Sequence, residues 1–170
     1  MVQGLSLPTR IAFVGPDDIL VIEKNNGTVS RILNGTISSQ PILDVNVNNE
    51  LERGMVGIAV LNGPIDSYVF LYFTEADSKD GGKALGKRLY RFELINDKLI
   101  NPRQLLDLPA TPGAIHNGGS IVIGPDRNVY LSVGDVDAEN FQNGDTSEGR
   151  AGILRVTPDV RYRRWWHSWE

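Results

Sequence analysis

The sequence predicts an all-β protein assembled from repeated antiparallel units of about four strands each. Short runs of Val, Ile, Leu and Tyr alternate with turns, and the 170 residues include 18 glycines and 9 prolines. No segment keeps an apolar period of 3.6 residues, so we expect essentially no long helix. An arginine between apolar residues recurs roughly every 60 residues, a spacing typical of successive propeller blades.

Two units are expected to be complete and a third to be incomplete. The first unit comprises the expected strands Ile11–Phe13, Ile19–Glu23, Val29–Leu33 and Ile42–Val45. The second comprises Val56–Val60, Tyr68–Thr74, Arg88–Leu94 and Lys98–Leu106. The third comprises Ser120–Ile123, Asn128–Val133 and Ile153–Thr157. We expect the first strand of each unit to be innermost, because short apolar strands fit the crowded centre of a propeller.

Charge and composition exclude several classes of function. The net charge is −4 with both signs scattered along the chain, which predicts no nucleic-acid surface. There is no cysteine, and so no disulfide or thiolate metal site. No apolar run approaches the roughly 20 residues of a membrane span. The first residues lead directly into the first strand, so we expect no signal peptide in this chain.

The most informative segment is Ala114–Asp135, which sets a histidine just before a glycine-rich turn. His116 is one of only two histidines and is followed by Asn117, Gly118 and Gly119, where the backbone can turn sharply. A histidine held at the start of a strand can be aimed at a ligand and can accept a proton near neutral pH. On spacing alone, a turn histidine without a chemical role is the simpler interpretation.

The full sequence of this segment favours a chemical role for His116. It reads HNGGxIxIGPDxxxYLSxGD, which resembles the central signature of the soluble quinoprotein sugar dehydrogenases, the glucose/sorbosone dehydrogenase family. Three further segments resemble that family in the same order along the chain: Leu5–Leu20, Glu52–Val60 and Ala151–Asp159. The resemblance implies a six-bladed β-propeller that oxidises a sugar hydroxyl, with pyrroloquinoline quinone and calcium as cofactors. It also implies an exported protein, periplasmic or extracellular, that passes electrons to a separate acceptor.

The resemblance assigns roles to four residues. His116 falls on the position of the general base, and Glu52, Asp135 and Asn140 fall where substrate contacts are expected. Without the resemblance, Glu52 could equally pair with the neighbouring Arg53, and Asp135 could cap a turn.

Two departures leave the particular sugar open. Ile115 replaces an acidic residue that some glucose-oxidising members carry, and Ser120 stands where an arginine is common. The resemblance therefore implies an aldose-type substrate without indicating glucose.

The length of the chain fits only part of such a propeller. Residues 1–159 are expected to form about two and a half blades, which cannot close a ring. Residues 160–170 contain all three tryptophans of the chain. One set of codons that encodes this tail gives a glycine-rich sequence when it is read one base later. The tail is therefore either the product of a frameshift or a genuine basic-aromatic segment. The cations that hold the cofactor are expected beyond Asp159, so this chain alone is expected to be inactive. Apolar residues of Val29–Leu33 and Ile153–Val156 should be exposed and favour self-association.

Two other segments resemble known binding loops only in part. Gly81–Arg88 nearly matches a phosphate-binding loop but lacks its Ser/Thr and precedes a strand, so we expect a cationic hairpin tip. Asp135–Asn140 lacks the glycine and glutamate of a calcium loop, so we expect a solvated acidic loop and assign no metal ligand in this chain. A non-catalytic propeller that serves as a binding module and a metal-dependent lactonase remain the alternative functions.

Overall fold

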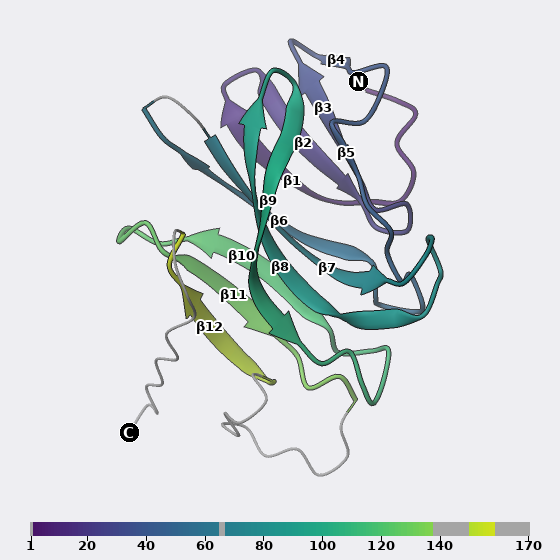
Figure 1. Cartoon of the computed structure of the whole chain (residues 1–170). Helices are drawn as coiled ribbons and strands as arrows, with labels where there is room; N and C mark the ends of the chain where they lie inside the picture. Colours follow the sequence, from purple (N-terminus) through teal and green to yellow (C-terminus); the bar gives the residue numbers. More distant parts are fainter. Residues whose placement is uncertain (1, 65–66, 138–149, 159–170) are drawn as a thin grey trace.

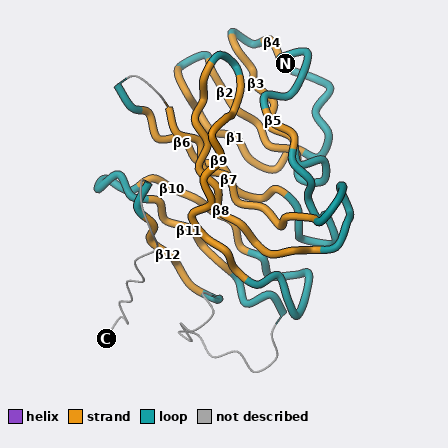
Figure 2. The backbone as a smooth tube through the Cα atoms, in the orientation of Figure 1, coloured by secondary structure: helices purple, strands orange, loops and turns teal. Residues whose placement is uncertain are grey.

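The computed structural model describes residues 2–64, 67–137 and 150–158. These residues form twelve strands in three antiparallel sheets, which follow one another along the chain (Figure 1). Within these ranges there is no helix (Figure 2), and thus none that could span a membrane. Asn140 and the tail 160–170 lie outside the described residues. The structure is therefore all-β, as the sequence predicts, with its sheets arranged as consecutive blades of a partial β-propeller.

The first sheet departs from the expected four-strand unit. It contains β1 (Pro8–Gly15), β2 (Asp18–Glu23), β3 (Thr28–Leu33), β4 (Thr36–Ile37) and β5 (Leu43–Asp44). The expected fourth strand Ile42–Val45 is wrong in extent, because two short strands share the edge of β3. Asn34 and Gly35 have positive φ and reverse the chain at once, so β4 pairs with the end of β3. Only the start of β3 remains for β5.

The second and third sheets follow the predicted pattern. The second runs in the order β6 (Met55–Asn62), β7 (Ser67–Ala76), β8 (Ala84–Ile95) and β9 (Lys98–Leu108). The third runs in the order β10 (Gly118–Ile123), β11 (Val129–Val133) and β12 (Gly152–Val156). Strand β6 lies beside both β1 and β10, so the first strands of the three sheets are neighbours. Side chains of β1 reinforce this contact, since Thr9 and Arg10 donate hydrogen bonds to the carbonyls of Met55 and Val56.

Two apolar clusters hold the three sheets together. Alternate residues of β7 point to opposite faces, as the two-residue period of a strand requires. Val69 and Leu71 pack with the first sheet, whereas Phe70 and Tyr72 pack with the third. All four side chains are almost completely buried, so the second sheet is covered on both faces.

The recurring arginines connect strands. Each lies in the third strand of its sheet and reaches back toward the second strand or the turn before it. Arg31 in β3 pairs with Asp18, and Arg155 in β12 pairs with Asp126 at 2.7 Å. Arg91 in β8 lies 4.3 Å from the centre of the Tyr68 ring. Arg31 also pairs with Asp97, before β9, and Arg91 Nη1 donates a hydrogen bond to the Pro158 carbonyl, after β12, at 3.2 Å. The repeat therefore marks structural contacts within a blade and, for these two arginines, with the next blade.

The expected exposure of two segments is partly wrong. Val29 packs between the first and second sheets, and Leu154 and Val156 pack between the second and third. Ile32 is also buried, so in these two segments the exposed apolar residues are Leu33 and Ile153. Further exposed apolar side chains lie on the outer two sheets: Ile11 and Phe13 on β1 and Val122 on β10.

Tyr72 generates a stability prediction. Its side chain is buried, its hydroxyl has no hydrogen-bond partner among the described residues, and burial raises its pKa far above the usual value. Because an unpaired buried hydroxyl is unfavourable, Tyr72→Phe should raise the free energy of unfolding by about 1 kcal/mol in denaturant melts. The control is Tyr130→Phe, which removes a hydroxyl that donates to Asp126 and should not stabilise the protein. A loss of stability in Tyr72→Phe would contradict this account.

Candidate active site

The loop between β9 and β10 carries His116 and is fixed at several points. The buried guanidinium of Arg53 donates hydrogen bonds from Nη2 to the carbonyl oxygens of Ala110 and Gly113. The backbone N–H of Gly113 donates to the carbonyl of Val136 at 2.8 Å. Segments that precede β6 and follow β11 thus brace the loop from two sides.

The backbone around His116 needs glycine at defined places. His116 itself has a φ of +55°, and its carbonyl accepts a hydrogen bond from the N–H of Val136 at 3.3 Å. A Cβ on Gly134 would lie 1.7 Å from that carbonyl oxygen, so only glycine allows the two segments to approach. Gly119 has a φ of +110°, and a Cβ there would lie 2.7 Å from the Val56 side chain. Gly119 thus lets the start of β10 lie against β6, and Gly134 lets the chain after β11 lie against the His116 backbone.

Three of the residues singled out from the sequence lie together at one end of the sheets. The backbone N–H of His116 donates to Glu52 Oε2 at 2.6 Å, and His116 Nδ1 lies 2.9 Å from Asp135 Oδ1. Glu52 precedes β6, His116 precedes β10 and Asp135 follows β11, so three different segments converge. The His116 side chain remains 56% exposed. The fourth residue, Asn140, is not among those described.

The hydrogen bond to Asp135 determines which imidazole nitrogen is available. The backbone N–H of Asp137 donates to Asp135 Oδ1 at 3.0 Å, and this bond, with that of His116, lowers the pKa of the Asp135 carboxyl. An ionised carboxylate only accepts hydrogen bonds, so Nδ1 must be the protonated nitrogen of the neutral ring. The lone pair is then on Nε2, and the exposed side of the imidazole can accept a proton.

The alternative pairing of Glu52 with Arg53 does not occur. Arg53 Nη1 instead forms an ion pair with Glu50 at 2.9 Å, which leaves the Glu52 carboxylate for the His116 backbone. Although the two residues are adjacent in sequence, the Glu52 side chain contacts His116 and the Arg53 side chain contacts the carbonyls of the loop before it.

Sequence reasoning missed Lys24, which follows β2 at the same end of the sheets. Its ammonium donates hydrogen bonds to the Leu51 carbonyl at 2.8 Å and to Asn25 Oδ1 at 3.1 Å. Partial burial lowers its pKa, and the Glu52 carboxylate opposes that effect. Antiparallel topology could have indicated it, because loops after every second strand lie at one end of a sheet.

Lys87 was also misassigned, because it does not belong to a solvated hairpin tip. It lies in β8 with only 1% of its surface exposed, and its ammonium has no hydrogen-bond partner among the described residues. Burial and the positive charges of Arg150 and Arg53 lower its pKa to about 8, while Asp135 opposes them. A buried ammonium group without a hydrogen bond to the described residues therefore lies near the carboxylate that contacts His116.

The described residues do not gather metal ligands. Within them, no group of three or more His, Asp or Glu side chains could hold an ion. The groups near His116 are two carboxylates, Glu52 and Asp135, and the partly buried ammonium of Lys24. Arg53 and Lys87 are enclosed by protein. These residues therefore do not fit a cradle for a calcium ion with an anionic quinone.

The geometry defines a class of protein: a partial β-propeller that presents an exposed histidine, whose ring is held by a carboxylate, at one end of its sheets. The family model described as Glucose / Sorbosone dehydrogenase matches residues 5–162, and the chain belongs to that family. Sequence comparison with curated proteins gives no match.

Solved structures place the chain beside sugar dehydrogenases. An oxidoreductase of Thermus thermophilus, described as a glucose dehydrogenase, is 28% identical with a TM-score of 0.78, over 94% of this chain and 47% of that one. The pyrroloquinoline quinone-bound aldose sugar dehydrogenase of Streptomyces coelicolor is 28% identical with a TM-score of 0.76, over 92% and 46%. The soluble aldose sugar dehydrogenase of Escherichia coli, 18% identical over 91% and 45% with a TM-score of 0.73, shares the fold. The chain thus spans about half the length of the structures it matches.

Lys87 generates a prediction with a defined pH dependence. Its pKa is lowered to about 8 in the folded protein from 10.5, so between these values the unfolded chain binds the proton and the folded protein does not. Stability should therefore rise with pH across this range. Lys87→Met should raise the free energy of unfolding by about 2 kcal/mol at pH 7, and this gain should shrink toward pH 10.

Denaturant melts of both proteins at several pH values measure this effect. Lys98→Met replaces an exposed lysine of β9 and serves as the control, with little change expected at any pH. A Lys87→Met variant that is less stable at pH 7, or whose gain is independent of pH, would contradict the view that the buried Lys87 charge destabilises the folded protein.

Proposed function

We propose that this chain belongs to an enzyme that oxidises a hydroxyl group of an aldose sugar, with His116 as the general base. The observation that carries the proposal is the exposed imidazole whose Nδ1 lies 2.9 Å from the Asp135 carboxylate. Membership of the glucose/sorbosone dehydrogenase family supports a sugar hydroxyl as the group that is oxidised.

In this proposal the sugar hydroxyl proton moves to Nε2 of His116. The ring then carries a positive charge, which the Asp135 carboxylate stabilises through Nδ1–H. Glu52 holds the His116 backbone through one carboxylate oxygen, and its other oxygen can accept a hydrogen bond from a second sugar hydroxyl. Asp135 contributes to the same substrate site, and we propose the same for Asn140. Because the base must be neutral before it acts, activity should fall at acid pH.

Oxidation also removes a hydride, whose acceptor the described residues do not supply. The Streptomyces coelicolor structure contains pyrroloquinoline quinone, which supports this quinone as the cofactor of the whole protein. We propose that the quinone and a calcium ion are held by a further part of a longer protein, which passes its electrons to a separate acceptor. By family resemblance, we propose that this longer protein is exported.

The role of His116 is tested in a full-length protein that carries this segment. His116→Gln keeps a polar side chain but removes the base, so turnover should fall by about 10²–10⁴-fold, the usual contribution of a general base. Sugar-dependent dye reduction with added pyrroloquinoline quinone and calcium measures turnover, and a quinone titration measures cofactor affinity, which should be unchanged.

Asp137→Asn is the matched control, because its side chain is exposed and only its backbone N–H contacts Asp135. It should retain full turnover. Unchanged turnover in His116→Gln would favour a binding module, whereas hydrolysis of lactones by metal-loaded protein would favour the lactonase alternative.

A further prediction concerns this chain by itself. It should show no sugar-dependent dye reduction when the quinone and calcium are supplied, because the groups near His116 do not fit the cofactor. Exposed Ile11 and Phe13 on the first sheet and Val122 and Ile153 on the third should favour concentration-dependent association. Sedimentation over a wide concentration range measures this, and an active, monodisperse monomer would overturn both expectations.

A further inference from the structure

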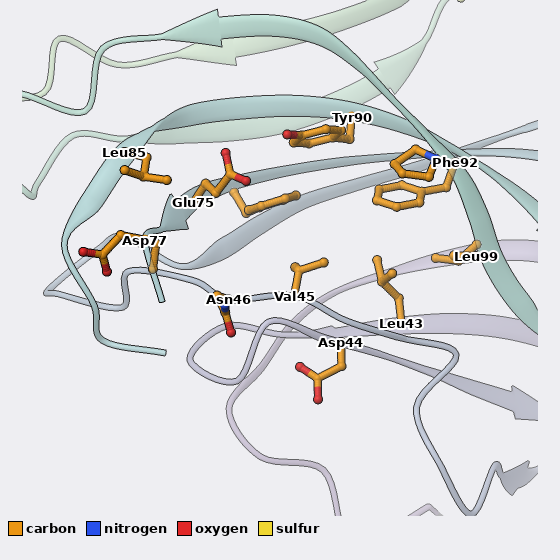
Figure 3. Close-up of a pocket in the computed structure, with 13 residues that line it drawn as sticks. Leu43, Asp44, Val45, Asn46, Glu75, Asp77, Leu85, Tyr90, Phe92 and Leu99 are labelled. Carbon is orange, nitrogen blue, oxygen red and sulfur yellow. The ribbon is translucent and has the colours of Figure 1, made fainter. Parts of the chain in front are cut away.

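A second candidate binding site lies between the first and second sheets, away from His116. A cleft of about 550 Å³ opens there, and its walls come from β5 and the residues after it, β7, β8 and β9. In Figure 3, Tyr90 and Phe92 lie across the cleft from Leu43 and Val45. A volume of this size falls within the usual range of small-molecule sites, roughly 300–1,000 Å³.

Three aromatic rings form one wall of the cleft. Phe73 and Tyr90 are stacked, with ring centres 5.5 Å apart and planes inclined by 13°. Tyr90 and Phe92 have ring centres 6.0 Å apart with planes inclined by 41°. Tyr90 is half-buried whereas Phe73 and Phe92 are buried, so Tyr90 is the ring of this wall that is most accessible to a ligand.

The charged groups of this cleft are all acidic. Asp44, Glu75 and Asp77 line it, and among the described residues no Lys, Arg or His does. Arg88 pairs with Glu75 at 3.2 Å but is also bound to Asp107, which shares its charge. Asp77 accepts hydrogen bonds from the Lys83 backbone and the Ser78 hydroxyl, neither of which neutralises it. Burial raises the pKa of Tyr90, and the negative charge of Glu75 adds to this effect, with Arg88 opposing.

We propose that this cleft binds a small organic cation that carries an alkylated ammonium group. A cation gains both from the aromatic faces and from the carboxylates, because an ammonium group is attracted to the electron-rich face of a ring. A neutral apolar molecule gains nothing from Asp44 and Asp77, and an anion is repelled by them. The proposal is independent of the proposed oxidation, since no lining residue belongs to the group around His116.

Choline and its neutral isostere 3,3-dimethylbutan-1-ol test the role of charge. Each is titrated into the chain at low salt, at a protein concentration where sedimentation shows one species, and NMR shifts of Leu43, Tyr90 and Leu99 are followed. Choline should shift these resonances saturably, and the isostere should bind at least about 5-fold more weakly, the difference expected for a cation–π contact. Equal binding of the two, or saturable shifts at other residues only, would overturn the proposal.

Variants test the ring and the carboxylates separately. Tyr90→Leu should weaken choline binding by about 5–30-fold, whereas Tyr90→Phe, which keeps the ring, should bind as the original chain does. Asp44→Asn should weaken binding at low salt and have less effect at high salt. Phe13→Leu removes an exposed ring of β1 outside the cleft and is the control. If Tyr90→Phe lost binding as fully as Tyr90→Leu, the ring would not be the recognition element.

Discussion

The burial of β7 between two neighbouring sheets is the interaction on which the rest of this structure depends. Its side chains alternate between two apolar clusters, so one strand anchors the first sheet on one face and the third on the other. A strand covered on both faces must be apolar at nearly every position, and the run Tyr68–Phe73 has this character. The sheets therefore stack face to face, and their first strands become neighbours.

That stacking creates the candidate active site without any dedicated element. Every second loop of an antiparallel sheet returns to the same end, and neighbouring sheets align those ends. Residues that precede or follow the strands thus meet, although His116 lies 64 residues from Glu52 and 19 residues from Asp135 in the sequence. Glycines at positions 119 and 134 permit the close approach, and Arg53 fixes the loop from below.

The same stacking leaves the aromatic and acidic cleft between the later strands of the first and second sheets. The first sheet provides only the two-residue strand β5 where the second provides long strands, so the edge of β3 is incompletely extended. Tyr90 of β8 is consequently only partly covered, whereas Phe92, two residues further along the same strand, is buried. One packing arrangement therefore produces both sites. The loops around His116 approach one another closely, whereas the first sheet does not fully cover the second sheet at the cleft.

Local sequence determined most of the strands, because apolar alternation and Gly, Pro and Asn turns act over a few residues. It also determined the His116 turn, whose glycines are adjacent in the chain. The family resemblance pointed to Glu52 and Asp135, but the contact between the Glu52 carboxylate and the His116 backbone joins distant segments. Lys87 is polar and follows a glycine-rich stretch, yet alternation along β8 places it on the same face as Leu89, which packs against the third sheet. The surroundings of Lys24 and Lys87 were decided by tertiary structure, since only the packing of one sheet on another determines which loops meet and which face of a strand is covered.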